Sequence, residues 1–249
     1  MEIRTEWVNL SVNDGTTMRA YVAQSATGSA KSGMLVLQEV FGVNPHIRDI
    51  TERFAREGYL AIAPELFHRT GEGFECSYTD FPAAMPHMQA LRDPQLEVDF
   101  RAAYDWLKAN GGQNMPVGAV GFCMGGRAAV LASIALPIDC AVSFYGGGIA
   151  PSQFNPGFLG RLKDVSAPVL LFWGGKDAHI GTGPMRAVTD ALTAAGKNFT
   201  NVEFGEADHG FFCDARASYH PASAAVAWPM VLAFLSTQMS AKERSAAAS

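Results

Sequence analysis

The sequence has little charge and few cysteines, and each shortage argues against a class of protein. Charged residues make up 17% of the 249 residues, and the formal net charge is −5. Binding to nucleic acid or to an anionic membrane surface needs a basic patch, so neither partner is expected. The four cysteines are too few for a disulfide scaffold, and no two of them form a C-x-x-C pair. A reduced, cytoplasmic setting is therefore expected.

Long apolar runs are also missing. No run approaches the roughly 18 apolar residues that a membrane span needs. The first ten residues, MEIRTEWVNL, carry three charges and lack the apolar core of a signal peptide. Hydrophobic residues nevertheless make up 48% of the chain, which is the usual share for a globular domain with its own core. We therefore expect a globular protein with neither leader nor membrane segment.

Motifs for nucleotides and metals are absent as well. The glycine-containing stretches YGGGIA and GTGP match neither the P-loop nor the G-x-G-x-x-G pattern. Five histidines lack the spacing of metal ligands: His46, His68, His87, His179 and His220. The sequence therefore predicts no cofactor and no metal.

Apolar runs alternate with amphipathic segments along the chain. The runs predict strands at 5–12, 18–24, 33–40, 59–64, 116–122, 139–148 and 167–177, with another beginning at 199. Helices are predicted at 44–58, 93–110, 123–135, 183–196 and 219–239. Two hairpin-like strands followed by alternating strands and helices indicate an α/β fold with a mostly parallel sheet flanked by helices.

The chain shows no shift in composition and no internal repeat that would divide it. We therefore expect a single domain over residues 1–240 and a disordered tail over 241–249. The segment 65–89 is long and irregular, with aromatic residues and prolines. Such a segment inside a compact domain is usually functional or contains short helices.

Four chemically reactive side chains follow predicted strands. They are Glu39, Cys123, Asp177 and His209. Because the sites of open parallel sheets form at the carboxyl ends of the strands, these residues are the candidates for chemistry. The other cysteines have no comparable setting; Cys140 opens a strand, and packing is the expected role of both Cys140 and Cys213.

The sequence Gly121-Phe122-Cys123-Met124-Gly125 matches the nucleophile elbow G-x-S-x-G with cysteine in place of serine. The elbow is a strained turn at which flanking side chains would collide with the neighbouring strand or helix. It also places the sulfur at a helix N-terminus, which favours the reactive thiolate. The N–H of Met124 would then face a developing oxyanion, with a second donor near Val40. The alternative is that Cys123 is a small buried residue.

Cysteine, aspartate and histidine occur in the chain order of the α/β-hydrolase triad. His209 would take the thiol proton or hold the thiolate as an ion pair, and later protonate the leaving group. Asp177 would orient the imidazole. Each residue has an alternative interpretation, since Asp177 could cap a turn and His209 could be a solvated loop residue.

The sequence resembles the dienelactone hydrolase (carboxymethylenebutenolidase) family of the α/β-hydrolase superfamily. The resemblance rests on LQEVFGVNPHIRDITERFAREGYLAIAPELF, GAVGFCMGG, SFYGGG, FWGGKD and DHGF, which together span nearly the whole chain. It implies a triad of Cys123, His209 and Asp177. It also implies that Glu39, in the Q-E motif, helps to control the ionisation of the cysteine. The alternative for Glu39 is a structural carboxylate paired with an arginine such as Arg48.

The family's named reaction hydrolyses an enol-lactone that bears a carboxylate, and the family associates two arginines with that carboxylate. Here 71–90 contains no arginine, and the nearest arginine after HGF is Arg216, three residues beyond the expected position. Arg69 and Arg216 are the remaining candidates. An apolar site would instead accept other lactones or esters, lined by Phe41, Phe81, Tyr145, Phe211 and Phe212.

Two functions follow from the sequence. The first is a cysteine-dependent hydrolase of a small lactone or carboxylic ester, acting as a monomer or small homo-oligomer. The second is a redox-responsive or ligand-binding protein on a hydrolase scaffold, with Cys123 as its sensor thiol. The absence of an obvious resolving cysteine weakens the second.

Overall fold

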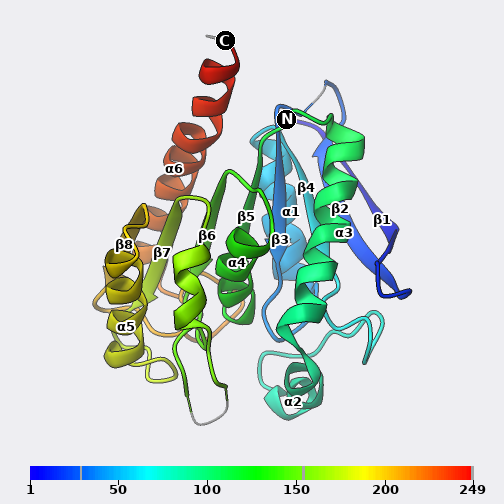
Figure 1. Cartoon of the computed structure of the whole chain (residues 1–249). Helices are drawn as coiled ribbons and strands as arrows, with labels where there is room; N and C mark the ends of the chain where they lie inside the picture. Colours follow the sequence, from blue (N-terminus) through cyan, green and yellow to red (C-terminus); the bar gives the residue numbers. More distant parts are fainter. Residues whose placement is uncertain (29, 153–154, 248–249) are drawn as a thin grey trace. The chain divides into compact units, whose positions relative to one another are not determined.

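A computed structural model describes residues 1–28, 30–152 and 155–247 (Figure 1). Its strands form one eight-stranded sheet in the order β1-β2-β4-β3-β5-β6-β7-β8. The sheet is mostly parallel, with antiparallel pairing of β1 with β2 and of β2 with β4. The predicted α/β class is therefore confirmed. The chain divides into two compact units, Met1–Ala119 and Val120–Ser249, which are taken in turn.

The first unit contains the N-terminal hairpin and the first crossovers. Its strands are β1 (Ile3–Ser11), β2 (Thr17–Ser25), β3 (Ser32–Leu37), β4 (Tyr59–Pro64) and the start of β5 (Val117–Phe122). Its helices are α1 (Pro45–Arg56), α2 (Phe81–Ala90) and α3 (Asp93–Gly111). Figure 1 shows α1 and α3 on opposite faces of β3 and β4, and both helices pack against these strands.

Local sequence explains why α1 begins and packs as it does. The side chain of Asn44 caps the helix by accepting a hydrogen bond from the N–H of Ile47, and Pro45 stands in the first turn. Ile47, Ile50 and Phe54 recur at helical spacing and are fully buried. The helix therefore anchors the loop that leads into it from β3.

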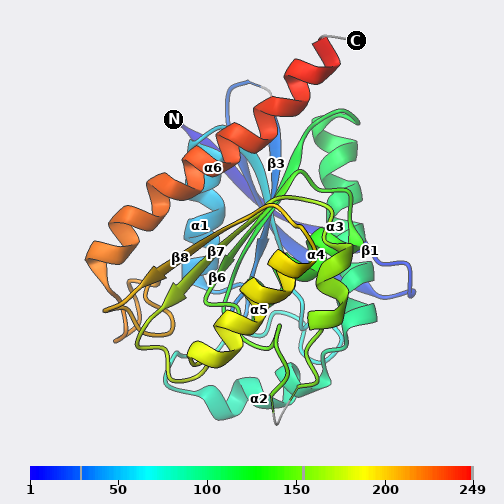
Figure 2. The ribbon, with the colours of Figure 1, turned by 60° about the vertical axis from the view of Figure 1, so that its left-hand side comes forward.

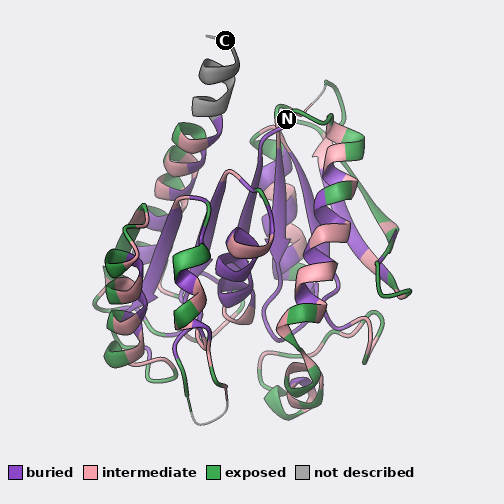
Figure 3. Cartoon of the chain, viewed as in Figure 1, coloured by how far each residue is buried: buried purple, intermediate pink, exposed green. Residues whose placement is uncertain are grey.

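The second unit holds the rest of the sheet. Its elements are the end of β5, α4 (Met124–Ala135), β6 (Cys140–Phe144), the short 3₁₀ helix η1 (Leu159–Asp164), β7 (Val169–Gly174), α5 (Thr182–Ala194), β8 (Phe199–Phe204) and α6 (Pro221–Ala247). Figures 1 and 2 show α4 and α5 on one face of β6–β8 and α6 on the other. Strands β6 and β7 are buried along their whole length, as the burial colours of Figure 3 show.

Phenylalanine side chains stack from strand to strand in this unit. Phe122 stacks on Phe144 with ring centroids 4.9 Å apart, and Phe144 stacks on Phe172 at 4.6 Å. Phe172 in turn stacks on Phe204 at 6.1 Å. Offset-stacked aromatic pairs contribute about 0.5–1.5 kcal/mol each beyond their buried area. The strands that lead to Cys123, Asp177 and His209 (β5, β7 and β8) thus share one aromatic layer with β6.

Helix α6 contains an apolar segment that is long enough to cross a membrane, whereas the sequence was expected to contain none. By length and composition alone, Pro221–Met239 would qualify as a membrane span, with a mean hydropathy of 1.3. One such helix is weak evidence, because core helices of globular proteins pass the same test. Its buried apolar side chains lie along one stripe at helical spacing, and the helix packs against β6 and β7; the stripe consists of Ala224, Ala227, Val231, Leu235 and Met239. This is the pattern of a helix that covers a sheet.

Several predicted boundaries differ from those of the structure. The strand predicted at 33–40 ends at Leu37, so Glu39 lies in the following loop. Helix α2 lies within and just beyond the predicted irregular segment, and η1 was not predicted. Helix α6 continues to Ala247, and residues 248–249 lie outside the described part of the chain. The single domain and the disordered tail stay predictions.

Candidate active site

Cys123 occupies a strained turn between β5 and α4. Its φ of 55° and ψ of −118° are rare for a residue with a side chain. The turn is held by the N–H of Cys123, which donates to the carbonyl of Phe144 at 3.0 Å, and by two N–H groups of α4 that donate to the Cys123 carbonyl. The side chain is partly exposed. This is the geometry expected of a nucleophile elbow.

The glycines around the elbow are required by close backbone contacts. A Cβ on Gly121 would lie 1.8 Å from the carbonyl oxygen of Gly125. A Cβ on Gly126 would lie 2.5 Å from the carbonyl oxygen of Phe144. The glycines therefore let α4 start directly against β5 and β6, as the pattern predicted.

The loops that carry Asp177 and His209 are joined through their backbones. The N–H of Gly175 donates to the carbonyl of Phe204 at 2.8 Å, and the N–H of Lys176 donates to the carbonyl of Ala207 at 2.9 Å. A Cβ on Gly175 would lie 2.7 Å from the Cα of Gly205, so the two chains pass in close contact. These contacts fix the two loops relative to each other.

A chain of hydrogen bonds joins Asp177, His209 and Cys123. Asp177 Oδ2 lies 2.7 Å from His209 Nδ1, and Asp177 Oδ1 accepts from the N–H groups of His179 and Ile180. The side chain of Cys123 hydrogen-bonds with His209. Asp177 and His209 are both buried. The three residues predicted from the strand ends are thus brought together within one unit.

Burial and the neighbouring charges set the ionisation of the imidazole. Burial acts to lower the pKa of His209, but the charge on Cys123, the hydrogen bonds with Asp177 and Cys123, and the charge on Asp177 together raise it to about 10. Burial acts to raise the pKa of Asp177, yet the hydrogen bond with His209, the charge on His209 and two N–H donors lower it. The arrangement thus favours the protonated form of the His209 imidazole.

We expect His209 to stay doubly protonated at pH 8 in the wild-type protein. Its ring ¹⁵N chemical shifts, followed from pH 5 to 11, should change near the pKa of about 10. Because this pKa is raised on folding, the stabilisation is complete below about pH 6.5, the pKa of an unperturbed histidine, and is lost as the pH rises through about 10.

The matched variant for this titration is Cys123→Ala, which removes the sulfur but leaves Asp177 in place. Its His209 should lose the second proton at a clearly lower pH than in the wild type. An equal titration midpoint in both proteins would contradict a contribution of Cys123 to the raised pKa of His209.

Tyr145 and Phe211, predicted to line the site, pack beside the triad. The ring of Tyr145 lies edge-on to His209 with centroids 5.1 Å apart, and Phe211 packs on Tyr145 at 5.4 Å. Both are fully buried, and Tyr145 has a φ of 39°. Tyr145 thus packs directly on the imidazole, and Phe211 packs on Tyr145. Phe212 belongs to the same aromatic cluster through its contact with Phe144.

The predicted site residues of the first unit lie after β3. Glu39 is fully buried, and Val40 and Phe41 are almost so. The alternative partner for Glu39, Arg48, instead pairs with Glu75 and donates to the carbonyl of Val43.

Phe81 also belongs to the first unit, where it is an exposed residue of α2. With 46% of its surface exposed, it does not form part of a buried apolar wall. That Phe81 lines the site stays a prediction.

The two candidate arginines have different surroundings. Arg69 forms a bidentate ion pair with the buried carboxylate of Asp99, with Nη1–Oδ2 and Nη2–Oδ1 distances of 2.8 and 2.7 Å. It also binds the carboxylate of Asp14. Its guanidinium is therefore engaged in holding the fold. Arg216 lies against Gly210, where a Cβ would be 2.3 Å from Arg216 Nη1. Of the two, Arg216 is the one placed beside the histidine loop.

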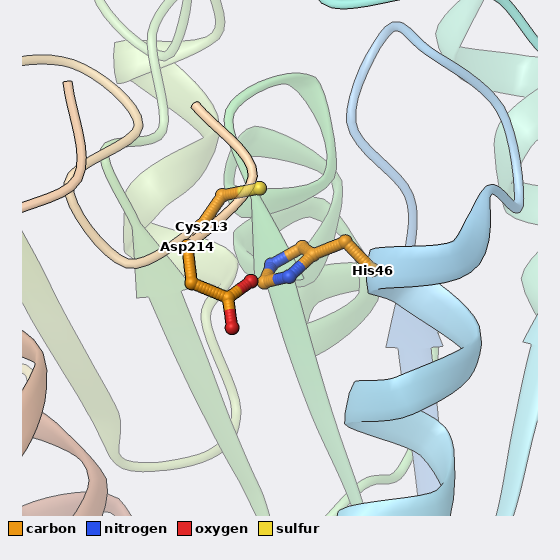
Figure 4. A group of neighbouring side chains, drawn as sticks. All are labelled: His46, Cys213 and Asp214. Carbon is orange, nitrogen blue, oxygen red and sulfur yellow. The ribbon is translucent and has the colours of Figure 1, made fainter. Parts of the chain in front are cut away.

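Figure 4 draws a group of potential metal ligands. His46 belongs to α1 of the first unit, whereas Cys213 and Asp214 belong to the segment after β8 in the second. Because these side chains come from different units, no metal site is inferred from them. The absence of a metal and of a cofactor stays an expectation from the sequence.

His179 is a neighbour of the triad that the sequence did not reveal. Its spacing fits no metal site, but its ring lies edge-on to His209 with centroids 5.3 Å apart. Its position two residues after Asp177 was the available signal, but the fold of the turn decides where the ring points.

Comparison with known proteins agrees with the geometry. The model of the dienelactone hydrolase family matches residues 18–239. The chain belongs to the dienelactone hydrolase family. It is 34% identical to a "Putative carboxymethylenebutenolidase" of Synechocystis sp., over 96% of this chain and 99% of that protein. It is 35% identical to a protein of the same name from Escherichia coli, over 88% of this chain and 82% of that one.

A solved structure of the dienelactone hydrolase family gives the same result. The crystal structure titled as a "Putative Dienelactone Hydrolase" from Klebsiella pneumoniae subsp. pneumoniae superposes with a TM-score of 0.86. It is 33% identical and covers 95% of this chain and 99% of its own. The chain is thus a hydrolase with the α/β-hydrolase fold, and the resemblance seen in its motifs is confirmed.

Proposed function

We propose that this dienelactone hydrolase family member hydrolyses small lactones or carboxylic esters through Cys123, His209 and Asp177. The observation that carries the proposal is the hydrogen-bonded chain from Asp177 through His209 to Cys123 at a strained elbow. An ion-paired cysteine at a helix N-terminus is a strong nucleophile near neutral pH.

In the first half-reaction the sulfur of Cys123 attacks the carbonyl carbon and forms a C–S bond. The N–H groups of Met124 and Val40 stabilise the oxyanion of the tetrahedral intermediate. The C–O bond then breaks, and His209 gives its proton to the departing alkoxide. A thioester remains on the enzyme; with a lactone, the released hydroxyl stays attached to the acyl group.

In the second half-reaction water replaces the alcohol. His209 takes a proton from water, the hydroxide attacks the thioester carbonyl, and the C–S bond breaks to release the acid and restore the thiolate. Asp177 holds the imidazole in the orientation that both steps need.

Residues outside the triad also have proposed roles. Glu39 helps to control the ionisation of Cys123, the role that the resemblance to the family implies for the glutamate of the Q-E motif. Arg216 binds a carboxylate on the substrate, a role supported by its position against Gly210. The proposal that Phe41, Tyr145 and Phe211 bind apolar parts of the substrate stays a prediction from the sequence, since all three are buried in the described structure.

Intact-mass analysis tests the proposal against the sensor alternative. We expect brief exposure to an aryl ester to add one acyl mass to the wild type and none to Cys123→Ala. Dilute peroxide is the control reagent. An oxygen adduct on Cys123 without any acyl adduct or turnover would favour a sensor thiol and contradict the hydrolase.

A further inference from the structure

Strand β1 forms one edge of the sheet and belongs to the first unit. It pairs with β2 on one side, and no strand of the described chain lies on its other side. Figure 1 labels β1 at the margin of the ribbon, and Figure 3 shows that most of the strand is exposed. An edge strand presents N–H and C=O groups that can hydrogen-bond with a further strand. This edge is therefore a candidate surface for pairing with another chain.

The backbone groups that face outward from β1 belong to its odd-numbered residues. The N–H of Ala26 donates to the carbonyl of Glu2, and the N–H of Val12 donates to the carbonyl of Thr16. The register of β1 on β2 is continuous between these two bonds. Residues of an antiparallel pair alternate between those that bond to the neighbouring strand and those that do not. The even-numbered residues of β1 thus bond to β2, and the odd-numbered ones point their N–H and C=O groups away from it.

The side chains of β1 carry opposite charges two positions apart. Arg4 and Glu6 are exposed, and neither forms an ion pair with the described residues. Because side chains alternate along a strand, these two lie on one face, and Ile3 and Trp7 lie on the other. Trp7 packs edge-on to Tyr21 with ring centroids 5.3 Å apart, and 38% of its surface stays exposed. Such a strand is complementary in charge to an antiparallel copy of itself.

The register of such a pair follows from the backbone and the charges together. Two copies related by a two-fold axis must pair antiparallel, with the outward groups of each strand facing those of the other. With the axis at Thr5, Arg4 faces Glu6 of the second copy, and Ile3 faces Trp7 of the second copy. An axis at Arg4 or at Glu6 would instead place two like charges directly opposite each other, which is destabilising.

The remaining registers satisfy fewer of these conditions. An axis at Ile3 would pair only residues 1–5, because the chain begins there. An axis at Trp7 would face Glu6 with the apolar side chain of Val8 and would form no cross-strand ion pair. The register with the axis at Thr5 is thus the one that combines a long backbone ladder with matched charges.

We propose that β1 pairs with β1 of a second copy of this chain, about a two-fold axis at Thr5, and that the protein is a homodimer through this edge. Backbone hydrogen bonds, ion pairs between Arg4 and Glu6, and packing of Trp7 on Ile3 hold the two copies together. Opposite charges and aromatic–β-branched pairs across strands both stabilise a sheet. The inference is independent of the proposed hydrolysis, since no residue of the triad belongs to β1.

The association of the full-length chain tests the charge pairing. Sedimentation velocity from low to high micromolar protein should show a monomer–dimer equilibrium for the wild type. Arg4→Glu places like charges opposite each other and should raise the dissociation constant about tenfold or more. The double variant Arg4→Glu with Glu6→Arg exchanges the two charges and should restore the wild-type constant. Arg186→Glu makes the same change in net charge on the exposed surface of α5 and should have no effect.

A disulfide tests the position of the axis. In the proposed register the Cα atoms of Thr5 and its copy lie about 5.5 Å apart, within the range of a disulfide. Thr5→Cys should therefore form a cross-linked dimer on mild oxidation. Asn9→Cys is the matched control, because it is also exposed and odd-numbered but would lie about 27 Å from its copy along the strands. The wild type, with Cys76 and Cys123 partly exposed, sets the background.

Circular dichroism of each variant checks that the fold is intact. A wild type that stays monomeric throughout would overturn the inference and would assign Arg4 and Glu6 to protection of the edge against pairing. A dimer with the same dissociation constant in Arg4→Glu as in the wild type would overturn it too, because the contact would then lie elsewhere. Failure of the double variant to recover, or equal cross-linking of Thr5→Cys and Asn9→Cys, would likewise refute the proposed register.

Discussion

The Cys123→Ala variant is expected to lose hydrolysis of a small lactone and of an aryl ester, with kcat/KM reduced by about 10⁴-fold or more. The sulfur forms the covalent intermediate, so no later step can proceed without it. The variant should fold, because the side chain is partly exposed and alanine fits the space that the cysteine occupies. Initial rates for both substrates, with circular dichroism to check folding, measure the effect.

Cys140→Ala is the matched control for the loss of a thiol. Cys140 is fully buried in β6, where burial and then the charge of Asp139 raise the pKa of its thiol. Its substitution should lower stability slightly through a small cavity but leave kcat/KM near that of the wild type. Equal rates for the wild type and Cys123→Ala would end the proposal of a cysteine nucleophile.

The Gly121→Ala variant is expected to lose about 3 kcal/mol or more of its free energy of unfolding. The added Cβ would stand 1.8 Å from the carbonyl oxygen of Gly125 and 2.2 Å from its carbonyl carbon. These are backbone atoms at the start of α4, which cannot rotate away as a side chain would. Denaturant unfolding followed by circular dichroism measures the loss of stability. A low yield of soluble protein would indicate a loss too large for the variant to fold.

Gly160→Ala controls for the general effect of a methyl group on glycine. Gly160 lies in η1, is exposed, and has nothing within 4 Å of the place of its Cβ. Its substitution should be neutral or slightly stabilising, because alanine restricts the unfolded chain. If Gly121→Ala and Gly160→Ala unfolded at the same denaturant concentration, the close contact at the elbow would be refuted.

Local sequence was enough for the strands of the sheet but not for every helix. Buried strands such as β7 stand out as continuous apolar runs, and their order along the chain predicts the α/β class. Helix α2 lacks an apolar face, since Ala84 is its one buried residue, and it contains Pro86. Its start depends on Asp80, which accepts from the N–H of Ala83. No periodic pattern marks such a helix.

Some features of the site could be predicted from the sequence and others could not. Cys123, Asp177 and His209 could be chosen because each follows a strand, and strand ends are recognisable in sequence. The edge-on contact of His179 with His209 depends on how a turn places a ring near a residue 30 positions later in the chain. The engagement of Arg69 with Asp99 likewise depends on packing between distant segments. Sequence spacing carries no signal for either contact.

The loops after β7 and β8 are hydrogen-bonded to each other, which constrains insertions and deletions in either loop. The same number of residues separates Phe172 from Asp177 as separates Phe204 from His209, and the two segments are bonded backbone to backbone. An insertion of one residue in either loop would shift one member of the pair by about 3.5 Å and break the 2.7 Å contact between them. Natural insertions and deletions should therefore avoid both loops or alter them together, and designed loop grafts should exchange them as a pair.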